Sequence, residues 1–392
     1  MIEEKMSARH LKTAFLVCVV FIVSSLGFWS RSSLSASQKL SSQSFNGEKF
    51  TPANSTLGFG ALLAVSPPSS PRRHALLQQA NVTEIDITIP ELPVWTEEDE
   101  AGFRAVSGQS TMTKGMIFAW LSHLRVLEWF LSSGLETALI MEDDMDWDIR
   151  LRSQQIPRVA AAFRTLFNLT YPSPSPSDFY YGAKTGWDIL YFGHFDRWNW
   201  LGAETGVGVQ IPSDLTSRPH AFIPDATVPP RYNMHPTTAN VLTALDVPSY
   251  TRIIHPSKFP FGSWAYAVNR ASAAHILSND VAAAAAPKWQ QDSLDNALNR
   301  ACASGILHCW TVNPEIFHHK EGRVNSLIDY KSDDGEPEAV VRQRNRTGET
   351  DEISCGFASG DFEFGGNMTR LQFLRQEVGR KGRCLKPGRE EA

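Results

Sequence analysis

Apolar and polar residues are distributed unevenly along the chain, and the sharpest contrast lies near its start. Residues 13–29 (TAFLVCVVFIVSSLGFW) carry no charged side chain, and basic residues flank them on both sides. A membrane-spanning helix needs about 17–25 such residues, whereas the apolar core of a cleaved signal peptide has about 7–15. The pattern therefore predicts an N-terminal transmembrane signal anchor, with a cleaved signal as the alternative. The serine-rich residues 30–56 that follow predict a flexible stem.

Beyond the stem, short apolar runs alternate with segments of helical periodicity. The runs predict strands over residues 59–66, 83–89, 137–141, 188–193 and 262–269. Apolar residues at helical spacing predict a helix over 114–132 that ends before Gly134, and another that begins at Arg270. This alternation favours an α/β fold with a mainly parallel central sheet flanked by helices. Residues 199–260 show no sustained period, so we expect a long irregular excursion there.

These patterns divide the chain into five segments. They are a cytoplasmic tail at 1–12, the anchor at 13–29, the stem at 30–56, a single globular domain at 57–330 and a polar C-terminal extension at 331–392. The 392 residues are 42% hydrophobic and 20% charged, which suffices for a packed core. A net charge of −5 does not indicate a nucleic acid as partner.

Glycosylation triplets and cysteines indicate that the globular domain lies in an oxidising, lumenal compartment. Five Asn-x-Ser/Thr triplets begin at Asn54, Asn81, Asn168, Asn345 and Asn367. Four of the five cysteines fall in the last third of the chain, and we expect two disulfides between the pairs closest in sequence. The expected pairs are Cys302–Cys309 and Cys355–Cys384. Four cysteines allow three pairings, and a zinc site is a further alternative, although no C-x-x-C spacing supports it.

An acidic run directly after the predicted strand 137–141 carries most of the chemical information. Glu142, Asp143 and Asp144 stand at the carboxyl end of that strand, which is where ligands bind in open α/β sheets. Adjacent carboxylates repel one another unless a cation or water separates them. Mg²⁺ and Mn²⁺ prefer such oxygen ligands together with substrate phosphates, so the run predicts a divalent-cation site. Both Glu142-x-Asp144 and Asp144-x-Asp146 have acid-x-acid spacing, and a solvated acidic loop is the alternative.

The residues around this run resemble glycosyltransferase family 25, which holds lipopolysaccharide galactosyltransferases, collagen galactosyltransferases and many fungal relatives. Residues 115–144 share with that family a glycine-led helix with a Ser-His-Leu step, an apolar strand and Glu-Asp-Asp. Residues 261–277 (FGSWAYAVNRASAAHIL) are similar to its Gly-x-x-Ala-Tyr strand and helix, and Asp295 begins its Asp-x-x-Leu step. The resemblance extends over residues 59 to about 325.

The resemblance implies a GT-A fold, a UDP-sugar donor and Mn²⁺, or Mg²⁺, at the acidic run. It implies transfer of a hexose, with galactose as the leading candidate, to a glycan or glycoprotein with inversion at the anomeric carbon. The protein would then be a single-pass type II membrane protein of the Golgi or endoplasmic reticulum. In the family the first strand often ends in Asn-Leu and arginines, whereas here Ala64-Val65-Ser66 precedes Arg72-Arg73, so the nucleotide end of the donor site is less well defined. The competing classes are a non-catalytic, cation-binding lectin-like module and a metal-dependent hydrolase.

Inverting transfer also needs a base that takes the proton of the acceptor hydroxyl. Asp292 and Asp295 are the candidates, and Asp295 is favoured because it matches the Asp-x-x-Leu step of the family. Helix capping is the alternative role for either. His318 is expected as a further metal ligand, and it stands beside His319 in a segment that could equally be a solvated loop.

Cofactor binding is expected at five further residues. Arg72, Arg73 and Lys114 are candidates for contact with the donor diphosphate, although solvated basic side chains are common. Trp264 and Tyr266 stand two apart on a predicted strand, so their rings face one side, as sugar-stacking residues would. Filling of the core explains the two rings equally well.

Overall fold

The computed structural model describes residues 50–107, 112–170, 179–196, 218–278, 293–320 and 348–387. The predicted cytoplasmic tail, the predicted anchor and most of the stem precede residue 50 and lie outside these ranges. Within the described ranges, no helix has the length and apolar character needed to cross a membrane.

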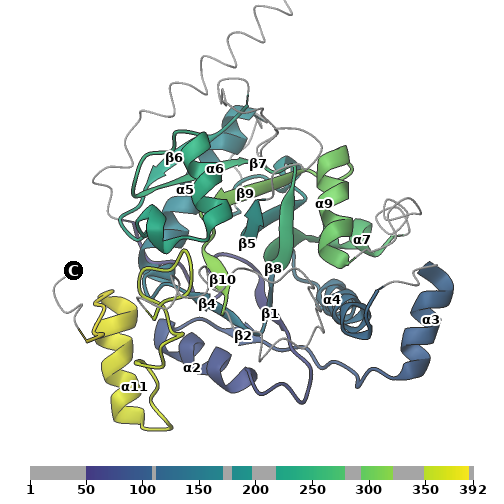
Figure 1. Cartoon of the computed structure of the whole chain (residues 1–392), viewed down its shortest axis with the longest axis horizontal. Coiled ribbons are helices and arrows are strands. Elements are labelled where there is room, and N and C mark those ends of the chain that lie inside the picture. The colour runs from purple at the N-terminus through teal and green to yellow at the C-terminus, as the bar shows by residue number, and fades with distance from the viewer. Residues whose placement is uncertain are drawn as a thin grey trace, which may run out of the picture.

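An eight-stranded sheet forms the centre of the molecule, in the order β2-β1-β3-β8-β5-β9-β7-β6 (Figure 1). The strands are β1 (Ala61–Val65), β2 (Ile87–Thr88), β3 (Thr137–Glu142), β5 (Ile189–Asp196), β6 (Ala221–Pro224), β7 (Thr251–Pro256), β8 (Pro260–Asn269) and β9 (Cys309–Asn313). β1 pairs in parallel with β2 and β3, and β5 with β9, whereas β8 and β7 are antiparallel to both of their neighbours. The other six strands therefore point in one direction. The α/β class and the flanked central sheet are confirmed, with two strands reversed.

Helices cover both faces of the sheet, which explains why its strands are apolar throughout rather than alternating. The helices are α2 (Arg73–Thr83), α3 (Glu97–Ser107), α4 (Lys114–Ser132), α5 (Ile156–Thr170), α6 (Pro236–Ala244), α7 (Arg270–Leu277), α9 (Leu294–Ser304) and α11 (Met368–Leu374). In β3, Leu139 and Met141 pack in the core with α2 and α5, whereas Ala138 and Ile140 pack in the core with α4, α7 and α9. Successive residues of a strand thus supply two separate cores.

Local signals define α4 at the residues that the sequence predicted. Thr113 accepts a hydrogen bond from the backbone N–H of Met116 at the start of the helix, which satisfies one of its free donors. Gly134 follows the end of the helix with φ +77°, a conformation that suits glycine. The prediction for 199–260 was wrong where the structure describes it, because residues 218–260 contain β6, α6 and β7. This segment has its own apolar cluster and extends the sheet by two strands.

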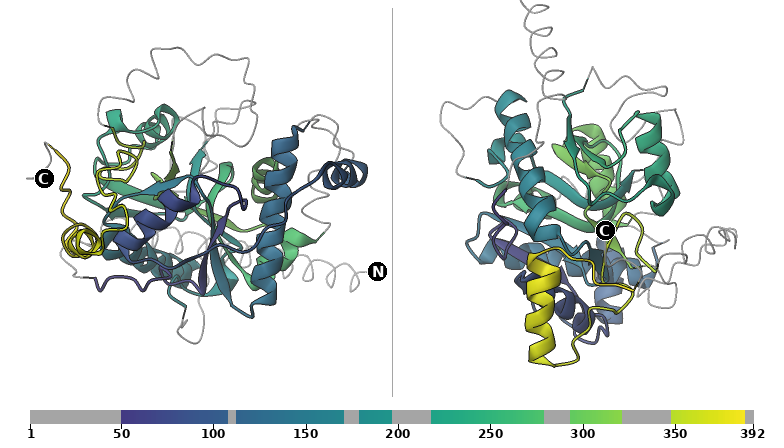
Figure 2. Two further views of the ribbon diagram at one scale, coloured as in Figure 1. Left: turned by 90° about the horizontal axis from the view of Figure 1, so that it is seen from below. Right: turned by 90° about the vertical axis from the view of Figure 1, so that its left-hand side faces the viewer.

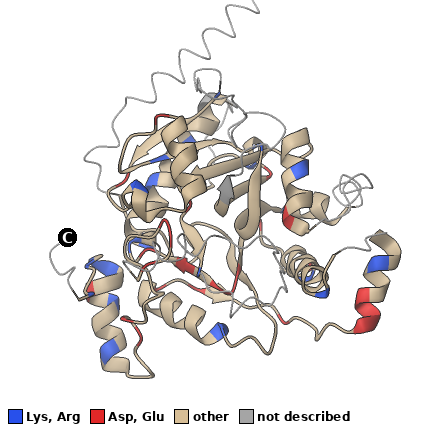
Figure 3. Ribbon diagram, in the orientation of Figure 1, with Lys and Arg blue, Asp and Glu red and all other residues tan. Residues whose placement is uncertain are grey.

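The C-terminal residues 348–387 pack against the globular domain rather than projecting from it. Phe357, Phe362, Leu371 and Val378 belong to the same core as α2 and α5. α11 and the π-helical turn Arg375–Arg380 that continues it lie beside α2 in both views of Figure 2. Basic residues of this helical stretch are drawn blue in Figure 3. Both predicted disulfides, Cys302–Cys309 and Cys355–Cys384, are present, so the predicted pairing is confirmed.

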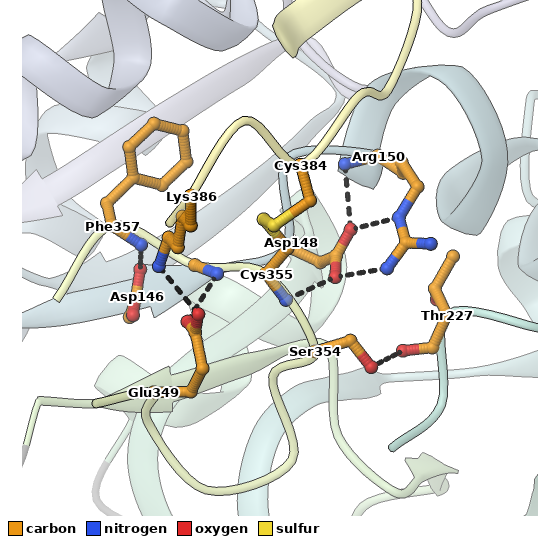
Figure 4. Close-up of a disulfide and its surroundings, with 11 residues drawn as sticks. Asp146, Asp148, Arg150, Thr227, Glu349, Ser354, Cys355, Phe357, Cys384 and Lys386 are labelled. Atoms are coloured by element: carbon orange, nitrogen blue, oxygen red, sulfur yellow. Dashed lines mark hydrogen bonds and ion pairs between the residues drawn. A yellow bond between two sulfur atoms is a disulfide. The ribbon is translucent and has the colours of Figure 1, made fainter. Parts of the chain in front are cut away.

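Two aspartates of the acidic segment hold this C-terminal segment in place. The carboxylate of Asp146 accepts a hydrogen bond from the backbone N–H of Phe357 at 2.8 Å (Figure 4). It also accepts one from the hydroxyl of Thr350 at 2.7 Å. Asp148 accepts from the N–H of Cys355 at 3.0 Å and pairs with Arg150 at 2.7 Å. Both carboxylates are completely buried. Asp146 is therefore a structural anchor, and the Asp144-x-Asp146 spacing does not describe a cleft-facing pair.

Candidate functional site

The carboxyl ends of β1 and β3 meet where the strand order of the sheet reverses. From β1 the chain passes through α2 to β2 on one side, and it then returns through α3 and α4 to β3 on the other side of β1. Open α/β sheets bind ligands in the crevice outside the carboxyl ends of the strands at such a reversal. Ser66 directly follows β1, and the acidic run begins at the last residue of β3.

A cleft of about 400 Å³ opens at this crevice. The three acids of the run line one side of it, and the loop after β1 contributes Arg72. Apolar and aromatic side chains line the rest, among them Pro68, Val94, Trp95, Phe118 and Trp264. The cleft thus combines an acidic end with walls that can contact flat, apolar surfaces of a ligand.

Asp143 is bound by the protein itself and joins the ends of β1 and β3. Its Oδ1 lies 2.7 Å from Arg72 Nε, and its Oδ2 accepts a 2.5 Å hydrogen bond from Ser66. Arg73 in turn donates to the hydroxyl of Ser66 at 3.0 Å. The Asp143 side chain is 1% exposed, whereas Glu142 and Asp144 retain 26% and 21% exposure. Glu142 and Asp144 are therefore the acid pair that the cleft presents, and Arg73 supports the site from behind.

Negative charge exceeds positive charge among the residues around this pair. Arg72 contacts Asp144 at 3.0 Å as well as Asp143, so a single guanidinium serves two carboxylates. Burial and the charges of Glu142 and Asp143 raise the pKa of Asp144 to about 7, although Arg72 opposes the shift. Burial also disfavours ionisation of Glu142, but its pKa is lowered overall by His123, by a hydrogen bond from Ser263 and by the nearby His319. The raised pKa of Asp144 reflects the excess negative charge at this end of the cleft, and the same charge would stabilise a bound cation.

A divalent cation fits these residues. The Oδ1 atom of Asp144 is buried and accepts no hydrogen bond from the described part of the chain. Carboxylate oxygens and an imidazole are suitable ligands for Mn²⁺, and carboxylates for Mg²⁺. Glu142, Asp144 and His319 line the cleft and are candidates for these ligands, whereas the cleft-lining Asp143 and His123 contact Arg72 and Tyr266.

The structure brings His319, and not the predicted His318, to the cleft. Both belong to β10 (Phe317–His319), which pairs with β4 (Met145–Trp147) in a separate two-stranded sheet. His319 lines the cleft with its ring 4.3 Å from that of Trp264, whereas His318 is completely buried and contacts Glu315 at 2.7 Å. Neighbouring residues on a strand face opposite sides, so only one of the two histidines can reach the acids. The histidine pair was recognisable in the sequence, but the strand that orients it was not.

Trp264 and Tyr266 have different surroundings, contrary to the prediction that they form one stacking surface. Trp264 lines the cleft. Tyr266 is completely buried, and its hydroxyl lies 3.0 Å from Nδ1 of His123. The Nε2 atom of His123 lies 3.8 Å from Glu142, so Tyr266 supports the acidic end indirectly. His123 belongs to the Ser-His-Leu step, which was the sequence signal for this contact.

The remaining predicted residues lie outside the set that lines the cleft. Lys114 begins α4 next to the cleft-lining Gly115, and its half-exposed ammonium group lies 3.7 Å from Glu97. Asp295 lies in the first turn of α9, where its carboxylate accepts hydrogen bonds from the N–H of Asn296 and the hydroxyl of Ser293. Asp295 is thus an acidic residue of the first helical turn that accepts one of the N–H groups there, whereas the N-cap residue of α9 is Ser293. Asp292 falls outside the described residues.

Two comparisons with known proteins identified no relative of the chain. A scan against protein-family models and a search of curated proteins both found no match to the chain. The fold and the cleft define an α/β protein with an acidic ligand site at the reversal of its strand order. Any more specific assignment depends on the quoted motifs and on the chemistry of the cleft.

Proposed function

We propose that this protein is a metal-dependent glycosyltransferase of GT-A type. It would move a hexose, with galactose as the leading candidate, from a UDP-sugar to a glycan or glycoprotein with inversion. The observation that carries the proposal is that Glu142 and Asp144 face a cleft at the reversal of the strand order, beside Arg72. The resemblance of residues 115–144 and 261–277 to glycosyltransferase family 25 supports the same reaction.

The cleft residues suit a donor that carries a diphosphate. A Mn²⁺ or Mg²⁺ ion held by Glu142, Asp144 and His319 would stabilise the departing diphosphate. Arg72 lies at the N-terminus of α2, so its guanidinium and the free N–H groups of that helix turn offer donors to phosphate oxygens. Asp143 keeps Arg72 oriented through their 2.7 Å contact.

The apolar walls suit the rest of the donor. Trp95, Phe118 and Trp264 offer ring faces for the nucleobase and the sugar. These walls also limit the access of water, which would otherwise compete with the acceptor hydroxyl. The base that deprotonates that hydroxyl stays a prediction: of the two candidates, Asp295 lies in the first turn of α9, outside the set of residues that line the cleft, and Asp292 lies outside the described residues.

We further propose that the catalytic domain is lumenal and is anchored by residues 13–29 as a single-pass type II membrane protein of the Golgi or endoplasmic reticulum. Both disulfides require an oxidising compartment to form and persist. The five glycosylation triplets after the apolar segment agree with this location.

A donor screen with the full chain tests the proposed reaction. Purified protein is incubated with individual UDP-hexoses, with and without Mn²⁺, and release of UDP is measured. We expect metal-dependent release with one donor, and a loss of at least about 100-fold in Asp144→Asn because the cation loses a ligand.

Asp246→Asn is the matched control, because Asp246 is exposed with φ +52°, a conformation that asparagine tolerates. Its activity should equal that of the parent. Binding of a cation and a sugar without turnover of any donor would instead support the non-catalytic, lectin-like alternative.

A further inference from the structure

A second group of metal-ligating side chains lies behind the cleft, away from the acidic run. Glu315 Oε1 and Glu352 Oε2 lie 2.7 Å and 3.2 Å from the same atom, Nδ1 of His318. The three side chains are completely buried. They come from two distant parts of the chain, since Glu315 and His318 belong to the segment that enters β10 and Glu352 belongs to the C-terminal segment.

Outer contacts hold the side chain of Glu352 and the backbone of Glu315 in place. The Oε1 atom of Glu352 accepts a 2.7 Å hydrogen bond from the backbone N–H of His235, which leaves Oε2 directed at His318. The backbone carbonyl of Glu315 accepts from the buried Arg252 at 2.9 Å. Glu352 also has φ +62°, a left-handed conformation that non-glycine residues rarely adopt and that the surrounding structure must stabilise. Supporting hydrogen bonds of this kind orient the ligands of natural metal sites.

The two buried carboxylates around His318 favour a bound cation over an empty site. A neutral imidazole carries one proton, so Nδ1 of His318 can donate fully to only one of the two carboxylates. A buried carboxylate in such surroundings takes up either a proton or a metal ion.

We propose that Glu315, His318 and Glu352 form a second metal site, which takes a divalent transition ion such as Zn²⁺. The three ligand atoms already lie within 4.8 Å of one another. In a tetrahedral site with bonds of about 2.0–2.2 Å, ligand atoms are roughly 3.4 Å apart, so the 2.7 Å contact between His318 and Glu315 would have to open when the ion binds. One imidazole and two carboxylates suit Zn²⁺, Mn²⁺ or Fe²⁺, and a fourth position would hold water. Coordination through Nδ1 requires the tautomer of His318 that carries its proton on Nε2, and a proton held by either carboxylate leaves to solvent when the ion binds.

An ion at this place would join the C-terminal segment to the wall of the cleft. The His318 ring lies 5.0 Å from the ring of Trp264, which lines the cleft. Glu352 is the member of the group that the C-terminal segment supplies. The ion would therefore stabilise the fold and the position of Trp264, and its binding does not depend on the proposed transferase reaction.

Metal analysis of the full chain tests the second site separately from the cleft. The parent for the test is Asp144→Asn, which weakens the cleft site. After loading with Zn²⁺ and dialysis, we expect about one Zn²⁺ per chain. Asp144→Asn/His318→Gln should retain none. Asp144→Asn/His308→Gln should retain the ion, because the His308 side chain is 64% exposed and is no member of the group.

Two further measurements on Asp144→Asn apply even if the His318 variant does not fold. Zn²⁺ at about a hundredfold excess over its Kd should raise the Tm by roughly 5 °C. Co²⁺ should give a visible absorption band that Zn²⁺ abolishes. A folded protein without bound Zn²⁺, without a Tm shift and without a Co²⁺ band would overturn the second site. Absence of UDP-sugar turnover would contradict only the transferase proposal.

Discussion

Three consecutive carboxylates at the end of β3 have different surroundings because the strand ends at Glu142 and the chain turns through Asp143 and Asp144. Glu142 and Asp144 face the cleft, and Asp143 points between β1 and β3, where Arg72 and Ser66 bind it. The sequence predicted the position of this group but treated its members as equal. The turn after β3 separates an accessible pair from a buried support, and the sequence did not show which of the three side chains Arg72 and Ser66 would bind.

At the same scale, Asp295→Asn tests the predicted base. Asparagine keeps an oxygen that can accept from Ser293 and Asn296, so we expect a change in stability within about 0.5 kcal/mol and nearly unchanged turnover of the donor. Initial rates and urea denaturation measure the two effects. A loss of about 100-fold or more in kcat would instead establish Asp295 as the base.

At the scale of elements, predictions succeeded where the signals are local and failed where contacts are distant in sequence. α4 has its cap, its apolar stripe and its terminal glycine within or beside its own residues. β4 and β10 are three residues long and exist only because they pair with each other. The C-terminal segment was predicted to be a polar extension, since a sequence does not show that Asp146 will contact Thr350, 204 residues later.

Asp146→Asn tests this anchoring of the C-terminal segment. The carboxylate accepts hydrogen bonds from Thr350 and Phe357, and an amide would direct its own N–H group at some of these donors. We expect a loss of about 2–3 kcal/mol in the free energy of unfolding and faster proteolysis after residue 347, measured by urea denaturation and limited digestion.

Asp361→Asn, at an exposed aspartate of the same segment, serves as the control and should leave both readouts unchanged. The anchoring role is disproved if the two variants behave alike. Gly356 packs directly against the Asp146 carboxylate, because a Cβ atom at this position would lie 2.5 Å from Oδ2 of Asp146.

At the scale of the whole molecule, a buried histidine makes stability depend on pH. His255 in β7 is completely buried, and burial lowers its pKa to about 3, assisted by the nearby His194 and His220. In the unfolded chain its pKa is about 6.5. Between these values the unfolded chain binds the additional proton, so acidification favours unfolding.

We therefore expect His255 to reduce the free energy of unfolding by about 1.4 kcal/mol for each pH unit below 6.5. Urea denaturation between pH 7 and pH 4 should show a shallower decline in His255→Asn than in the parent. His308→Asn is the control, because the exposed His308 should leave the decline as it is. If the free energy of unfolding declines equally steeply with falling pH in His255→Asn and in the parent, His255 does not cause the decline.

The order of synthesis has a consequence for the region next to the acidic run. Asp146 and Asp148 are translated early, but the N–H groups that bind them belong to Cys355 and Phe357. A ribosome must therefore add about 200 further residues before these two aspartates can bind the C-terminal segment. A chain that stops shortly before residue 348 would keep the local contact of Asp148 with Arg150 but would lack the segment that covers both carboxylates.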